Sequence, residues 1–498
     1  MPTYIEQPPT PSILLASLRN TGYTLKSAIA DVIDNSITAQ AQHISVQSRY
    51  PIAQGSPWIA ICDNGEGMDR DLLCSSMKFG SRDLEAARRG TRDLGRFGLG
   101  MKTASISQCR RMTVFSWQSG VCSAFSWDLD QISVQWDMQE LDNAEIESHP
   151  ALHEILECLR FDVQEHGTVV LWEKLDRDYV KNSRNFNTAM EMVEKHLCQV
   201  FHRFMEPEPG FPDIVHFDRN NRVLYPVSPF GRDLPGCQRL PGDRIPCGDF
   251  HVEYRPYLLP PAVCYTRTED YRALGGDEGY MLNQGFYVYR NRRLIEKATW
   301  FKVRKKEFKT QLLRIRLDMP AELDGLWGVD VRKSQTSPPS EVMDVLSHIV
   351  DSALEAARQF WDGGQRTRHP AERPKESAWI VPGDNKSGGY RVNKEHELYK
   401  MLLKALPRPE LRKVFSEYMD MISELFPYDL YYADRSQNEG AWQGSESDTN
   451  TRLANLINNL VEAGLDENAV RHMLCCFETG FPDGLVKQYL NIKYNGHV

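Results

Sequence analysis

The sequence predicts an α+β protein with two α/β parts followed by a helical C-terminal region. Short segments that alternate apolar and polar residues follow one another closely between helical segments, as in an antiparallel sheet. A second group of such segments lies between about residues 210 and 335 and precedes a long amphipathic helix. After a polar, Pro- and Gly-rich stretch, the pattern is mostly helical from about residue 393 onward.

Composition narrows the class of protein. At roughly 100–200 residues per domain, a chain of 498 residues is expected to hold about two to four domains. The formal charge of −9 excludes a protein that binds nucleic acid over its whole surface, although local basic patches are compatible with it. Eleven cysteines without a C-x-x-C pair are typical of reduced thiols, so we expect a cytoplasmic protein. With neither a signal peptide nor an apolar run of membrane-spanning length in the sequence, we expect no membrane association.

The first chemical motif lies in a segment predicted to be one helix, residues 13–35. The end of this helix holds Asp31, Asp34 and Asn35, while neighbouring positions are apolar. Asn and Asp are poor helix formers, so their concentration on a half-buried helix indicates either a functional site or a solvated face.

Two further motifs follow in order. The stretch "DNGEGM", residues 63–68, comes directly after the strand-like "WIAIC", and "GRFGLGMKTAS", residues 95–105, enters a helix. Between them, residues 80–97 are charged and punctuated by glycine, which predicts a loop. Each motif alone is common, because Gly-rich turns often merely join elements. Their order and spacing are what carry information.

Together with "HGTVVLW", residues 166–172, these motifs resemble the nucleotide site of the GHKL ATPases. This superfamily includes type II topoisomerases, MutL, the large heat-shock chaperones, histidine kinases and the MORC proteins. The resemblance covers roughly residues 13–175. It implies a Bergerat-fold ATP-binding α/β sandwich.

The resemblance assigns five residues to the adenine. Asp63 matches the family carboxylate that accepts a hydrogen bond from the adenine amino group. Gly65 and Gly67 lack side chains, so the base can lie against the backbone. Met68 ends the same motif, and Thr168 matches the threonine of the family's G-T strand near the adenine.

The resemblance also assigns residues to the phosphates and to the metal ion. Asn35 offers an amide oxygen to Mg²⁺, which prefers hard oxygen ligands shared with phosphates. The loop at residues 80–97 becomes an ATP lid. Backbone amides at a helix N-terminus bind phosphate well; here they belong to Gly98, Leu99, Gly100, Met101 and Lys102.

The chain departs from the family at the catalytic position. Asp31 stands where the family has a glutamate, so we expect an ATPase with slowed turnover, in which Asp31 orients or deprotonates the attacking water. Asp34 is the alternative base. Thr38 replaces the acid that commonly ends the family's N-x-x-D-A sequence, which weakens the match to any one subfamily.

The second α/β part resembles the S5-type transducer domain of MutL, heat-shock chaperones and MORC proteins. The resemblance is carried by "GFYVYRNRRLI", residues 285–295, and by "GVDVRKSQTSPP", residues 328–339. Lys333 is the candidate catalytic lysine for the γ-phosphate and Arg332 is the alternative. A solvated surface lysine is an equally good interpretation. The expected boundaries are an ATP-binding domain with an N-terminal arm at 1–208, a transducer-like domain with its long helix at 209–362, a linker at 363–392 and a helical domain at 393–498.

Within this branch, "FGSRD", residues 79–83, and "GRFGLGMKTAS", residues 95–105, look most like prokaryotic MORC-like and MutL-like proteins, and "GFYVYRNRRLI" agrees. This resemblance implies ATP-dependent homodimerisation, with DNA modification or antiviral defence as the setting and other defence proteins as partners. Basic clusters at 290–293 and 302–309 predict a phosphate-binding surface for double-stranded DNA, or else a strand edge kept soluble by lysines. The leading hypothesis is an ATP-gated DNA clamp. The alternatives are a chaperone-like protein-remodelling ATPase and a nucleotide-binding scaffold without hydrolysis.

Overall fold

A computed structural model of the chain divides into two units, residues 1–358 and 359–498, and each is described by itself. The structure describes residues 10–20, 22–51, 55–79, 94, 100–132, 135–231, 236–260, 268–329, 336–364, 379–380, 391–406, 408–424 and individual positions between 451 and 490.

The first unit begins with an eight-stranded sheet in the order β5-β4-β3-β6-β2-β1-β7-β8. Neighbouring strands are antiparallel except β1 and β7, which are parallel. The strands are β1 (His43–Arg49), β2 (Trp58–Asp63), β3 (Cys109–Gln118), β4 (Val121–Asp128), β5 (Gln139–Leu141), β6 (His166–Leu175), β7 (His216–Arg219) and β8 (Arg222–Val223).

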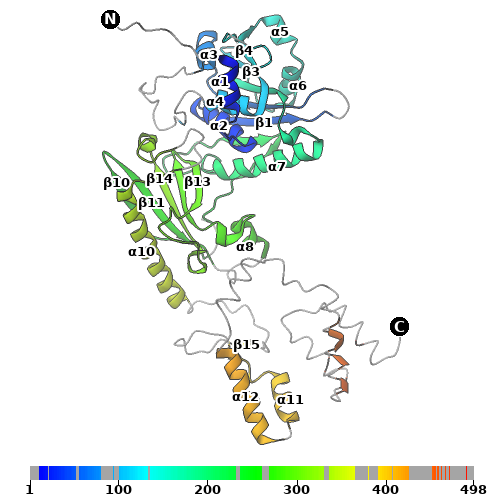
Figure 1. Cartoon of the computed structure of the whole chain (residues 1–498), viewed down its shortest axis with the longest axis vertical. Helices are drawn as coiled ribbons and strands as arrows, with labels where there is room; N and C mark the ends of the chain where they lie inside the picture. The colour runs from blue at the N-terminus through cyan, green and yellow to red at the C-terminus, as the bar shows by residue number, and fades with distance from the viewer. Residues whose placement is uncertain are drawn as a thin grey trace. The chain divides into compact units, whose positions relative to one another are not determined.

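Both faces of this sheet are apolar and both are covered (Figure 1). On β2, Ile59 and Ile61 enter one core while Ala60 and Cys62 enter the other, because successive side chains of a strand point to opposite faces. The first core is shared with α1 (Pro11–Arg19), α2 (Leu25–Thr38), α3 (Arg70–Met77), α4 (Gly100–Gln108) and α7 (Ser183–Val200). The second is shared with α5 (Asn143–Glu147) and α6 (Pro150–Cys158).

The segment predicted as one helix, residues 13–35, forms two helices, so that prediction is wrong. Gly22 has φ +81°, a conformation that lets the chain turn between α1 and α2. Thr24 then starts α2 with a capping box: its hydroxyl accepts from the Ser27 amide at 3.3 Å, and the Ser27 hydroxyl accepts from the Thr24 amide at 3.0 Å.

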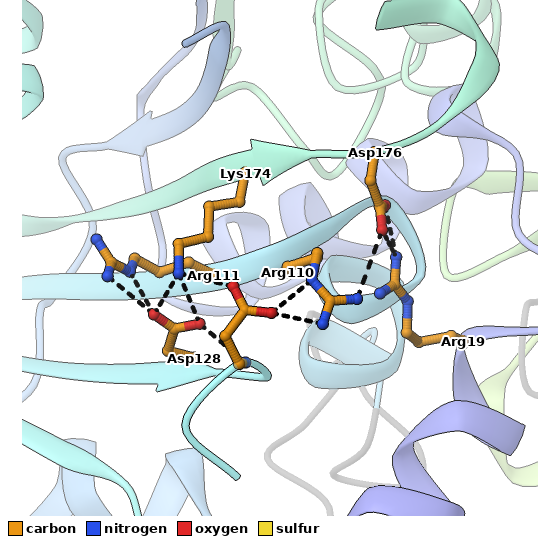
Figure 2. Close-up of polar contacts among 7 residues, drawn as sticks. Arg19, Arg110, Arg111, Asp128, Lys174 and Asp176 are labelled. Carbon is orange, nitrogen blue, oxygen red and sulfur yellow. Dashed lines mark hydrogen bonds and ion pairs between the residues drawn. The ribbon is translucent and has the colours of Figure 1, made fainter. Parts of the chain in front are cut away.

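A chain of alternating charges fastens α1 to the sheet (Figure 2). Arg19 donates to both carboxylate oxygens of Asp176, at 2.5 and 2.7 Å. Arg177 donates to the carbonyl of Arg19 at 2.9 Å. The network continues along β3, β4 and β6 through ion pairs among Arg110, Arg111, Asp128, Asp130 and Lys174.

A second sheet follows in the order β10-β11-β14-β12-β13, with β9 paired to β11. The long helix α10 (Ser340–Gly364) covers one face, and an aromatic cluster that includes Tyr257 and Tyr287 covers the other. Its strands are β9 (Gln238–Arg239), β10 (Asp243–Cys247), β11 (Phe250–Leu258), β12 (Gly285–Arg290), β13 (Arg293–Thr299) and β14 (Leu313–Met319). Short helices α8 (Thr268–Gly275) and α9 (Gly279–Leu282) lie between β11 and β12 in the chain, and the short helix η5 (Ala321–Asp324) follows β14.

In the second unit, β15 (Trp379–Ile380) pairs with β16 (Arg391–Val392), followed by α11 (Glu397–Ala405) and α12 (Pro409–Glu424). The predicted α+β class with an additional helical region is confirmed. Every helix in the described part of the chain is too short or too polar to cross a lipid bilayer. The expected domain boundaries stay a prediction; the first sheet extends to Val223.

Candidate functional site

Asp63 ends β2 and is buried, with 5% of its surface exposed. Its Oδ2 accepts a hydrogen bond from the Ser36 hydroxyl at 2.6 Å, and its Oδ1 accepts from the Gly65 amide at 2.9 Å. Burial raises the pKa of Asp63 to about 6, although both hydrogen bonds favour the ionised form. The two hydrogen bonds fix the orientation of the carboxylate, and a pKa of about 6 leaves it mostly ionised at neutral pH.

Three side chains form a polar line across β2, β6 and β3. Asp63 lies opposite Thr168, and Thr168 lies opposite Ser116, in the registers of these strands. The Thr168 and Ser116 hydroxyls are 3.0 Å apart. The Met68 amide donates to the Ser116 hydroxyl at 2.9 Å, so the turn after β2 is tied to the same line. Predicted residues Asp63, Met68 and Thr168 are thus brought together.

The two glycines of this turn are required by the packing of the protein itself. Gly67 has φ +66°, and a Cβ there would lie 1.8 Å from the Trp117 carbonyl oxygen. A Cβ on Gly65 would lie 2.7 Å from the carbonyl oxygen of Ala39, just after α2. The turn therefore presses its backbone against β3 and the end of α2.

The polar residues of α2 divide into two groups. Asn35 is exposed. Asp31 and Asp34 are only 2% and 1% exposed. Arg293 of β13 reaches both acids: Nη2 lies 3.0 Å from Asp31 Oδ1, and Nε lies 2.7 Å from Asp34 Oδ1. The Tyr23 hydroxyl donates to the other oxygen of Asp31 at 2.7 Å. The two acids are thus buried, and Arg293 and Tyr23 are their neighbours.

Leu94 is a described residue of the predicted lid, and its side chain is fully buried. Its amide donates to the Thr38 hydroxyl at 3.2 Å, and its carbonyl accepts from Arg290 Nη1 at 3.0 Å. Thr38, which stands where the family has an acid, therefore serves as a lid contact. The remaining lid residues, with Gly98, Leu99 and Lys333, lie outside the described residues.

The predicted phosphate-binding amides lie at the start of α4. The helix begins at Gly100, and a Cβ there would meet no atom of the described residues within 4 Å. Met101 is half-buried. Lys102 is 2% exposed and its Nζ donates to the Ser76 carbonyl at 2.6 Å, which commits its ammonium group to α3. Backbone amides remain the groups that this end can offer to an anion.

The basic cluster at 290–293 is not a surface patch, which corrects the prediction from its sequence. Arg290 is 1% exposed and binds both oxygens of Asp324, at 2.7 and 2.9 Å. Arg292 packs over the rings of Phe204 and Phe211. In the second cluster, Arg304 pairs with Asp351, whereas the exposed basic side chains are Lys302, Lys305, Lys306 and Lys309, with exposed Glu307 between them.

Comparison with known proteins agrees with this geometry. Residues 23–168 match the family described as "Histidine kinase-, DNA gyrase B-, and HSP90-like ATPase". The N-terminal domain belongs to the GHKL superfamily. The matched segment contains α2, the turn after Asp63 and α4, and it ends at Thr168. It is thus an ATP-binding domain of the kind that usually hydrolyses ATP.

Among solved structures, the chain is similar to one entitled "Crystal Structure of N terminal domain of a DNA repair protein". The identity is 15% and the TM-score is 0.41, over 70% of this chain and 99% of the other. A search of curated proteins found no match.

Sequence reasoning missed four contributors to the site: Ser36, Ser116, Tyr23 and Arg293. Ser36 and Ser116 are small polar residues among apolar neighbours in the sequence. This pattern alone predicts little, and it indicates a site only when the strand register is known. Arg293 was visible as a conspicuous charge beside the transducer strand. Its neighbours Arg290 and Arg292 made it resemble part of a surface cluster.

Proposed function

We propose that the chain is an ATP-hydrolysing GHKL ATPase whose ATP-dependent dimerisation closes a clamp on double-stranded DNA. The proposal that the chain binds a nucleotide rests on the environment of Asp63. This carboxylate is buried, is oriented by hydrogen bonds from Ser36 and Gly65, and lies opposite Thr168 in the strand register. A carboxylate held in this way accepts a hydrogen bond from an adenine amino group with little reorganisation.

Within this proposal, Asp63, Gly65, Gly67, Met68 and Thr168 surround the adenine. The phosphates lie at the start of α4, against the amides of Gly98, Leu99, Gly100, Met101 and Lys102. Lys333 contacts the γ-phosphate. Asp31 orients the attacking water and is the general base.

Asn35 holds Mg²⁺ together with the phosphates. Its exposure on α2 fits this role, because Mg²⁺ usually takes only one or two protein ligands and completes its shell with phosphates and water. In the described part of the chain, acidic, histidine and cysteine side chains form no cluster able to hold a metal alone. The bound ion would neutralise phosphate charge.

Dimerisation and DNA are supported by the contacts of the lid and by the remaining basic residues. Arg290 of the second sheet binds the lid residue Leu94, so a lid that changes position on binding ATP would act on that sheet. The exposed lysines at 302, 305, 306 and 309 offer a sequence-tolerant surface for phosphates. The defence or DNA-modification setting rests on the MORC-like appearance of residues 79–83, 95–105 and 285–295. A cytoplasmic setting suits the free cysteines.

One observation favours a nucleotide-binding scaffold instead. Both oxygens of Asp31 already accept hydrogen bonds, from Arg293 and Tyr23, which restrains its access to a water molecule.

The deciding experiment measures ATP turnover with and without duplex DNA at two salt concentrations, and particle mass by light scattering with a non-hydrolysable ATP analogue. We expect turnover, a doubled mass with the analogue, and DNA binding that weakens as salt rises. Binding of ATP without turnover would select the scaffold. Turnover and dimerisation without DNA binding would select the protein-remodelling ATPase.

A further inference from the structure

Two carboxylates and one guanidinium form a buried cluster between α2 and β13. The side chains of Asp31 and Asp34 are each 1% exposed, and that of Arg293 is 4% exposed. Two ionised carboxylates one helical turn apart repel each other, and burial of an unpaired charge is strongly unfavourable. Arg293 is the cation that lies against both carboxylates.

The β12–β13 hairpin delivers Arg293 to this place. Its two-residue turn, Asn291 and Arg292, has φ +46° and +72°, the geometry that tightly reverses two strands. Arg290 and Arg293 flank the turn as a register pair. Arg292 fixes the tip by packing over Phe204 and Phe211, beyond the end of α7. Because the hairpin is short and anchored, the Arg293 guanidinium has little freedom to follow α2 if α2 and the second sheet separate.

The remaining contacts of Asp31 restrict it further. Tyr23, which precedes α2, donates to Oδ2, while Arg293 donates to Oδ1. Burial and the charge of Asp31 raise the pKa of Tyr23, so its phenol stays protonated and acts as the donor. One carboxylate oxygen of Asp31 thus accepts its hydrogen bond from the ATP-binding domain, and the other accepts its hydrogen bond from the second sheet.

We infer that Arg293 is a positioning residue that holds Asp31 in its working orientation and so makes ATP hydrolysis depend on the seating of the β12–β13 hairpin. This inference rests on the proposed role of Asp31. Arg293 contacts neither substrate nor metal in it; it acts through the carboxylate. When the hairpin is seated, Asp31 is oriented and its charge is balanced. When the hairpin withdraws, Asp31 and Asp34 are left to repel each other and Asp31 loses its fixed geometry.

The test is a kinetic double-mutant cycle on the full chain. Turnover at saturating Mg-ATP and the ATP dissociation constant are measured for the parent, Arg293→Lys, Asp31→Asn and the double variant. Lysine keeps the positive charge, so the buried acids stay compensated and the variant is expected to fold. Arg244→Lys is the matched control, because Arg244 lies on β10, at the opposite end of the same sheet from β13, and pairs there with Glu253 and not with either acid. Thermal melting confirms folding of each protein.

We expect Arg293→Lys to turn over ATP about 10- to 100-fold more slowly, since small misplacements of a reacting group have effects of this size. Its ATP affinity should stay within about threefold of the parent. In the Asp31→Asn background, Arg293→Lys should slow turnover no further, and Arg244→Lys should keep nearly the parent rate.

Several results would overturn the inference. They are parent-like turnover of Arg293→Lys, an equal slowing in the Asp31→Asn background, an equal slowing by Arg244→Lys, or loss of ATP binding by Arg293→Lys. A parent that binds ATP without turning it over would overturn the proposed hydrolysis, and the inference with it, and is distinguished from the other results by the parent measurement alone.

Discussion

Arg290 Nη1 donates a 3.0 Å hydrogen bond to the carbonyl oxygen of Leu94, joining the second sheet to the predicted lid of the ATP-binding domain. The same guanidinium binds both carboxylate oxygens of Asp324, and Arg290 and Asp324 are almost completely buried. Because the guanidinium is planar and rigid, its three hydrogen bonds fix Leu94 relative to Asp324. Leu94 in turn binds Thr38 of α2.

Replacement of Arg290 by lysine should destabilise the protein. Lysine keeps the charge but cannot make the two-pronged contact with Asp324 while reaching Leu94. The loss of a buried, charge-assisted hydrogen bond costs about 1.5–3 kcal/mol in the free energy of unfolding. Chemical denaturation measures this value. Arg304→Lys, at a partly exposed pair with Asp351, is the matched control and should cost less than about 1 kcal/mol. Equal costs at the two positions would show that the buried link is unimportant.

ATP affinity should depend on pH through Asp63. Because the pKa of this carboxyl is raised to about 6, it is ionised above that value and protonated below it. The ionised form is the stronger hydrogen-bond acceptor, so affinity should be full near pH 8 and fall as the pH drops through about 6. Mg-ATP titrations across this range test the prediction. In Asp63→Asn the dependence should vanish; if the variant keeps the parent's pH profile, another group is responsible.

Stability should fall in acid through the charged network of Figure 2. Burial alone would raise the pKa of Asp128, but hydrogen bonds from Lys174, the Asp130 amide and Arg111 outweigh it and the net pKa is lowered. A lowered folded-state pKa gives stability that is present above the unfolded value of about 3.9 and is lost as the pH falls through the folded value.

Asp128→Asn is the variant that tests this linkage. Its difference from the parent in unfolding free energy should be largest near pH 7 and shrink below about pH 4. Asp71→Asn, at a highly exposed carboxylate, is the control and should show little difference at any pH. A difference for Asp128→Asn that does not change between pH 7 and pH 3 would contradict the assigned linkage.

The sequence predicts the nucleotide motifs because their geometry is local. Asp63 follows a strand directly, and the alternation of β2 and β6 places Thr168 opposite it once the two strands pair. The expected single helix at 13–35 failed although its signals were present: Gly22 and the Thr24–Ser27 cap mark a boundary that apolar periodicity hides.

The arginines of the hairpin could not be placed from sequence. A buried arginine and a surface arginine have the same local pattern, and only the packing of distant segments decides between them. Arg290 binds Asp324 and Leu94, and Arg293 pairs with acids that lie far from it in the chain. The residues that connect the nucleotide site to the second sheet are therefore those that local reasoning assigned to a DNA surface.

The most direct test of the proposed ATP site is a calorimetric titration of Mg-ATP into the parent, Asp63→Asn and Glu66→Gln. Glu66 is an exposed acid in the same turn, so its variant changes the charge equally without touching the buried hydrogen bonds. We predict that Asp63→Asn weakens ATP binding about 10- to 100-fold, the equivalent of about 1.5–3 kcal/mol for a lost charge-assisted hydrogen bond, while Glu66→Gln binds like the parent. Unchanged affinity of Asp63→Asn would contradict the assignment of Asp63 and the nucleotide site built around it.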